Sequence, residues 1–77
     1  MSKLEVLVSI IDELIVLEQT VTLETKLFAD LELDSLDYIE IVMGFEDHYN
    51  IEIPDEDLED VVTVADLLNI KPLAKFS

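Results

Sequence analysis

The sequence predicts an all-α domain: a four-helix bundle of three main helices and one short helix, with a long loop between the first two. Apolar residues recur with the 3.6-residue helical period in two long stretches, and no tight hairpin turn signal interrupts the chain. Hydrophobic residues make up 51% of the 77 residues, which is enough for a core. A chain of this size buries only about 60% of its unfolded surface, so we expect marginal stability.

The first helix is expected at the start of the chain. Ser2 and Glu5 have the spacing of a capping box, in which each side chain satisfies a backbone N–H of the other residue. The apolar face at i, i+3, i+4 and i+7 comprises Leu4, Leu7, Val8, Ile11, Leu14 and Ile15, widened by Val6, Ile10, Val16 and Leu17. From 18 to 34 this period is lost, which indicates a long and therefore often functional loop. Its expected anchors are Val21, Leu23, Leu27, Phe28, Leu31 and Leu33.

A second helix is expected from Asp34 or Ser35 to about Asn50. One apolar stripe predicts its core face: Tyr38, Ile41, Val42, Phe45 and Tyr49. A second, separate stripe comprises Leu36, Ile39 and Met43, with Asp37, Glu40 and Asp47 beside it. A helix needs only one buried face, so the second stripe is either further core or a surface for a partner.

The remaining chain predicts an extended link, a short helix and a last helix. Residues 51–54 should be extended, because the residue before a proline disfavours the helical conformation. Residues 55–60 form one acidic helical turn, with Leu58 and Val61 directed inward. Thr63 then begins a last helix in a capping-box pattern with Asp66, and this helix is expected to reach Ile70 before Pro72 stops it.

The charge balance excludes several functions. Nineteen acidic residues against four Lys give a net charge of −15, and the interval between Lys26 and Lys71 holds 14 acids and no Lys or Arg. Nucleic-acid binding needs cations, so we expect none, and no membrane insertion either. We expect a cytoplasmic monomer that meets basic partners. The crowded acids at 55–60 predict weak Mg²⁺ or Ca²⁺ association, but no EF-hand or other specific metal site.

The most informative residue is Ser35, at the junction of the long loop and the second helix. Free backbone N–H groups and the helix dipole favour a negative group there, so a phosphate ester would be stabilised. The alternative is that Asp34 and Ser35 are only helix caps. A serine hydrolase is excluded, because the only histidine, His48, lies several turns along the same helix. No other catalytic constellation is present, so we expect no enzyme.

Residues 27–64 resemble the acyl carrier protein family. The resemblance rests on Asp34-Ser35-Leu36, the helix that follows with Glu40 and Met43, and the segment Ile51-Glu52-Ile53-Pro54-Asp55, in a short acidic chain. It implies a single acyl carrier domain over 1–77 with a four-helix bundle. It also implies that Ser35 carries 4′-phosphopantetheine, attached by a phosphopantetheinyl transferase with Mg²⁺, and that Asp34 is the acid the transferase reads. Acyl groups would travel on the arm as thioesters.

The resemblance also implies a docking surface for basic patches on acyl-transferring synthases. The expected contact residues are Leu36, Asp37, Ile39, Glu40, Met43, Glu46 and Asp47. The core, including Leu7, Ile11, Val42, Phe45, Leu58, Val61 and Leu67, is expected to loosen for the acyl chain, although bulky Phe45, Tyr38 and Tyr49 could restrict the space.

Several positions depart from the family pattern. Glu32 stands where the family often has glycine, Tyr38 and Leu58 are larger than usual, and Asp60 replaces a base common in fatty-acid members. They suggest a specialised carrier. The leading hypothesis is a carrier of fatty-acid or polyketide-type cargo, and a carrier of aminoacyl or other cargo is the alternative. An unmodified acidic adaptor or nucleic-acid mimic is the alternative from another class.

Overall fold

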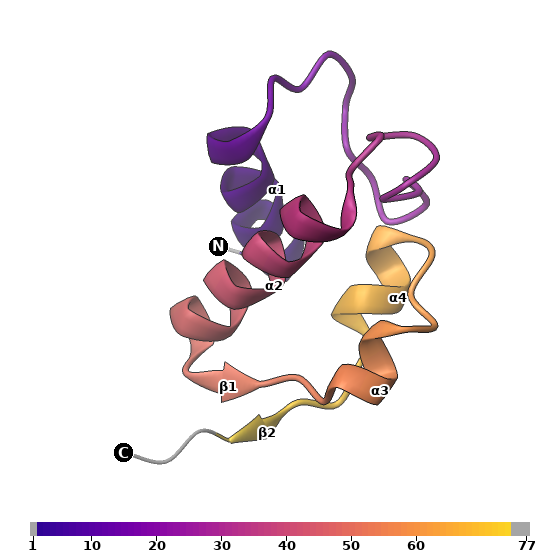
Figure 1. Ribbon diagram of the computed structural model, residues 1–77. Helices are drawn as coiled ribbons and strands as arrows, with labels where there is room; N and C mark the ends of the chain where they lie inside the picture. Colours follow the sequence, from indigo (N-terminus) through magenta and orange to yellow (C-terminus); the bar gives the residue numbers. More distant parts are fainter. Residues whose placement is uncertain (1, 75–77) are drawn as a thin grey trace.

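The structure is a computed structural model that describes residues 2–74. It contains four helices arranged as the predicted bundle and one short two-stranded ribbon (Figure 1). The elements in chain order are α1 (Lys3–Leu14), α2 (Ser35–Tyr49), β1 (Ile51–Glu52), α3 (Asp55–Leu58), α4 (Val64–Leu68) and β2 (Leu73–Ala74). Helices α1 and α2 pack against each other, and α4 packs on α1, so the all-α prediction is confirmed. Within residues 2–74 no helix combines the length and apolar character needed to cross a membrane.

Capping residues set where α1 and α4 begin. The Ser2 hydroxyl accepts the Glu5 N–H at 3.1 Å, and the Glu5 carboxylate accepts the Ser2 N–H at 3.0 Å. Thr63 and Asp66 make the equivalent pair of bonds at the start of α4. Both predicted capping boxes are therefore confirmed. They could be predicted because each depends on residues only three apart in the sequence.

The ends of these two helices were predicted too late. Helix α1 ends at Leu14, and Ile15 is already extended. Val16 is 85% exposed, so Val16 and Leu17 do not widen the helical face. Helix α4 ends at Leu68 rather than Ile70, and the Asn69 N–H closes its last turn on the Ala65 carbonyl. Apolar residues after a helix continue its pattern without continuing its backbone, and no glycine or proline directly follows either helix.

The ribbon closes the bundle at the C-terminal end of α2. Strands β1 and β2 pair antiparallel, with Ile51 opposite Ala74 and Glu52 opposite Leu73. The extended link predicted at 51–54 is confirmed, but its pairing was not predicted. The two strands are separated by α3 and α4, so no local turn sequence could indicate that they meet.

The core lies between α1, α2, α4 and the long loop. Its fully buried side chains are Leu7, Ile11, Leu27, Ile41, Val64 and Leu67. Gly44 lets α1 approach α2: a Cβ at this position would lie 3.2 Å from the Ile10 Cγ2. The one glycine of the chain, which weakens the helix by about 1 kcal/mol, therefore lies where the Ile10 side chain of α1 packs close to the α2 backbone.

Backbone hydrogen bonds fix the long loop against the segment that joins α3 to α4. The Leu27 N–H donates to the Val62 carbonyl at 3.0 Å, and the Val64 N–H donates to the Thr25 carbonyl at 2.9 Å. Four of the six predicted anchors are buried: Val21, Leu27, Leu31 and Leu33. Leu23 is 48% exposed, so this prediction was wrong, whereas Phe28 is 41% exposed but packs its ring against Tyr38 of α2. A loop has no period from which to tell inward from outward side chains.

Candidate functional site

Ser35 is the first residue of α2, and its side chain is exposed. The cap of this helix is Asp34, whose Oδ1 accepts the Asp37 N–H at 2.8 Å. At the starts of α1 and α4 a hydroxyl makes the capping bond, but at α2 the carboxylate does so. The Ser35 hydroxyl therefore takes no part in capping α2 and lies open at the helix start.

The loop turn before Ser35 is held in a conformation that favours glycine. Glu32 has φ of 56° and lies between the buried side chains of Leu31 and Leu33. The Leu33 N–H bonds the Leu27 carbonyl at 3.4 Å, which holds the turn in place. The glycine that the family often has at this position would suit this positive φ, whereas Glu32, with its Cβ, is strained there.

The start of α2 suits a phosphate ester on Ser35. The positive end of the helix dipole favours a negative group attached at this position, while the Asp37 and Tyr38 N–H groups of the first turn are already bonded to Asp34. The open side chain leaves room for a long substituent, so the residues fit 4′-phosphopantetheine. Neighbouring Asp34 adds negative charge, which attracts a cation rather than the phosphate itself.

The second apolar stripe of α2 lies on the surface. Leu36, Ile39 and Met43 are 66%, 52% and 56% exposed, so they do not belong to the core. Glu40 and Asp47 beside them are exposed as well, and Asp37 is half-buried. The structure thus brings apolar and acidic side chains together on the face that was expected to meet partners. Docking there remains a prediction.

Glu46 has a structural contact that the sequence did not reveal. It is half-buried, and its Oε2 accepts the Ile53 N–H at 2.6 Å. This bond ties α2 to the link before α3. The Glu46 carboxylate that was expected to contact partners is therefore also used in an internal hydrogen bond. A helical sequence pattern does not predict such a bond.

Tyr38 was expected as a core residue but also makes a polar contact. Its side chain is buried, and its hydroxyl donates to the Leu58 carbonyl at 3.0 Å. The ring packs edge-on against Phe28, with ring centroids 5.1 Å apart. Burial raises the pKa of Tyr38 to about 12, so the hydroxyl stays protonated and able to donate even above its ordinary pKa of 10. The only sequence feature that pointed to this contact was the unusually large side chain at position 38.

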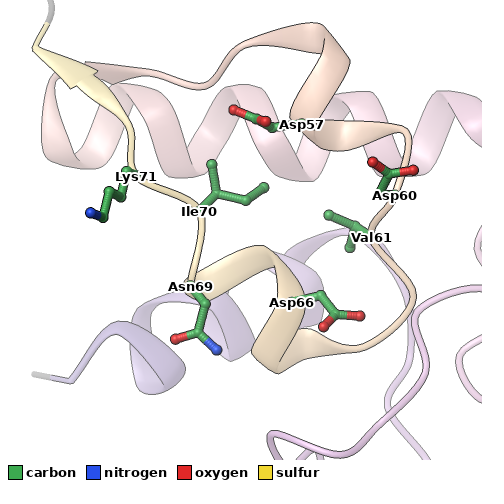
Figure 2. A pocket seen from close by; sticks show the side chains of 7 residues that line it. All are labelled: Asp57, Asp60, Val61, Asp66, Asn69, Ile70 and Lys71. Atoms are coloured by element: carbon green, nitrogen blue, oxygen red, sulfur yellow. The ribbon is translucent and has the colours of Figure 1, made fainter.

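The acidic surface near α3 also contains an open pocket of about 410 Å³ (Figure 2). Asp57 and Asp60 approach it from the α3 side, and Asp66 approaches from α4. The Thr63 and Val62 N–H groups bond the Asp66 carboxylate and hold its pKa below its usual range. Among residues 2–74 no three His, Cys, Asp or Glu side chains are placed to hold a metal ion. This pocket is therefore not a metal centre in the described structure.

A helical bundle with an open serine at the start of its second helix is the arrangement expected of a carrier domain that holds its cargo on a tether. Comparison with known proteins agrees. Residues 5–70 match the family model described as the phosphopantetheine attachment site. The chain belongs to this family, that of the acyl carrier proteins.

Named relatives support the same assignment. The chain is 42% identical to the acyl carrier protein of Campylobacter concisus over 67 residues, which cover 86% of this chain and 87% of the relative. It is 46% identical to that of Akkermansia muciniphila over 59 residues, covering 77% and 74%. A solved structure of a Mycobacterium tuberculosis protein assigned to the acyl carrier proteins has a TM-score of 0.82 at 25% identity, covering 90% of this chain and 93% of that one.

Membership in the family determines the general role of the chain. Acyl carrier proteins are carriers and not enzymes, and their cofactor is a covalently attached 4′-phosphopantetheine. They carry acyl cargo and interact with phosphopantetheinyl transferases and with synthases. The chemistry of such a carrier therefore belongs to the attached arm and to partner enzymes.

Proposed function

We propose that this chain is a single acyl carrier domain over 1–77 that carries acyl intermediates as thioesters on a 4′-phosphopantetheine arm attached to Ser35. The cargo belongs to fatty-acid or polyketide-type biosynthesis, and the carrier works in the cytoplasm as a monomer. A transferase supplies the arm from coenzyme A. The Ser35 oxygen attacks the phosphorus next to the pantetheine, the bond to the adenosine bisphosphate breaks, and the serine proton leaves to a base on the transferase.

The open hydroxyl of Ser35 carries this proposal. Asp34 already makes the capping bond of α2, so capping does not account for the serine. The side chain stands in the field of the helix start, where the phosphodiester is stabilised by about 0.3–1 kcal/mol. Asp34, directly beside it, is the acid that we expect the transferase to read.

The docking face lies immediately beyond Ser35 on the same helix. Exposed Leu36, Ile39 and Met43 offer an apolar contact, and the acidic residues Asp37, Glu40, Glu46 and Asp47 surround it. A net charge of −15 attracts basic synthase patches and repels anionic surfaces. This combination supports synthases and the transferase as partners.

The test is to co-express the chain with a phosphopantetheinyl transferase and to measure the intact mass. We expect one phosphopantetheine on the wild type and none on Ser35→Ala. Ser9→Ala is the matched control, because Ser9 is also exposed but lies within α1; it should keep the adduct. An unmodified wild type would overturn the proposal in favour of an acidic adaptor.

A further inference from the structure

A groove of about 270 Å³ lies between α2 and α3. Its α2 side comprises Tyr38, Ile39, Val42, Met43 and Glu46, and its other side comprises Glu52, Ile53, Asp55 and Leu58, so both apolar and acidic side chains line it. One water molecule occupies about 30 Å³ in the liquid, so the volume corresponds to about nine waters. A methylene group is similar in size, and the groove therefore has room for a short alkyl chain.

The groove lies in line with Ser35. At 3.6 residues per turn, Ser35, Ile39, Val42 and Glu46 (i, i+4, i+7, i+11) form one stripe along α2, and the last three line the groove. With a rise of 1.5 Å per residue, the stripe extends about 16 Å from the serine. A chain tethered at Ser35 and folded back on α2 would therefore meet this groove first.

Two hydrogen bonds between a side chain and the backbone join the two sides of the groove. At the distant end the Glu46 carboxylate holds the Ile53 N–H at 2.6 Å. At the end near Ser35 the Tyr38 hydroxyl holds the Leu58 carbonyl at 3.0 Å. Tyr38 follows Ser35 by one helical turn, so its bond crosses the groove where a tethered chain would begin to enter.

We propose that Tyr38 is a specificity-determining residue: its bond to Leu58 restricts the access of an acyl chain from Ser35 to the groove between α2 and α3. The inference rests on the proposed attachment at Ser35. The other two bulky residues, Phe45 and Tyr49, line a separate apolar cavity of about 150 Å³ at the far end of α2, so they do not act at this entrance.

The Tyr38→Phe variant isolates the hydroxyl. It keeps the ring and its contact with Phe28. The Leu58 carbonyl also keeps a second donor, the Val61 N–H at 3.5 Å, so the variant leaves no carbonyl without a partner. Losing one neutral hydrogen bond should favour the open groove by about 2- to 10-fold.

The experiment compares octanoyl and acetyl thioesters on wild type, Tyr38→Phe and Tyr49→Phe, with hydroxylamine cleavage as the readout. A chain that enters the groove withdraws its thioester from the reagent. We expect Tyr38→Phe to slow octanoyl cleavage by about 2- to 10-fold relative to wild type and to leave acetyl cleavage unchanged. Tyr49→Phe should behave as wild type, because Tyr49 lies outside the groove.

Two results would overturn the inference: equal octanoyl rates in wild type and Tyr38→Phe, or equal slowing of both thioesters. Failure to load the arm would instead refute attachment at Ser35. The Tyr38 contact can then be judged on the unmodified protein, by hydrogen exchange of the Val61 amide. Exchange should be faster in Tyr38→Phe by the same factor, and an unchanged rate would show that the bond does not hold α3.

Discussion

Replacing Glu32 with glycine should stabilise the fold. A residue with a Cβ in the left-handed region costs roughly 1–2 kcal/mol, and Glu32 lies there at φ 56°. Glycine removes this cost but loses about 0.5–1 kcal/mol more conformational freedom on folding. The difference is a net stabilisation of up to about 1.5 kcal/mol, and about 0.75 kcal/mol at the middle of both ranges. For a domain of this size the middle value corresponds to a rise in Tm of roughly 3–6 °C, measured by circular dichroism on the unmodified protein.

The control for this prediction is Glu32→Gln. Removing one carboxylate from a chain with a net charge of −15 relieves repulsion by itself, and Gln does so while keeping the Cβ. The strain argument therefore requires that Glu32→Gly melt above Glu32→Gln, not only above wild type. If the two variants melt together, charge rather than backbone strain explains the gain, and the argument from φ is refuted.

Three further predictions concern the surface and Tyr38. Glu40→Lys should slow association with a basic synthase about three- to tenfold at low salt. Glu13→Lys makes the same charge change on α1 and should have little effect. Equal slowing in both variants would show that overall charge, not the docking face, sets the association rate. Tyr38 should contribute stability that is present below pH 10 and lost as the pH rises to about 12, because its folded pKa is raised; urea unfolding of Tyr38→Phe should lack this loss. Added Mg²⁺ should raise Tm by countering the acids at 55–60, and a flat titration would contradict that argument.

The features that the sequence predicted correctly depend on residues close together in the chain. The start of α2 and both capping boxes follow from pairs of residues three apart, such as Ser2 with Glu5 and Thr63 with Asp66. The two stripes of α2 were separated by helical period alone, and the exposure of Leu36 confirms that the second is not core. Periodicity is a reliable signal wherever one helix face meets one core.

The features that were not predicted from the sequence join residues that are distant in the chain, or lie in segments without a periodic pattern. The Tyr38 hydroxyl bonds a carbonyl twenty positions away, and the bond between Glu46 and Ile53 leaves α2 for the following link. The pairing of β1 with β2 depends on the packing of α3 and α4 between them. In each case one partner is a backbone group, and every residue has such groups, so composition and spacing give no sign of the contact.

The start of α2 shows why an acidic residue and a serine stand side by side at the attachment point. If Ser35 were the cap, its oxygen would bond a backbone N–H, and converting that oxygen into a phosphate ester would change the capping bond whenever the arm is loaded. With Asp34 as the cap, the bond to Asp37 is independent of what Ser35 carries. The helix that presents the docking face can therefore keep the same first turn before and after the arm is attached.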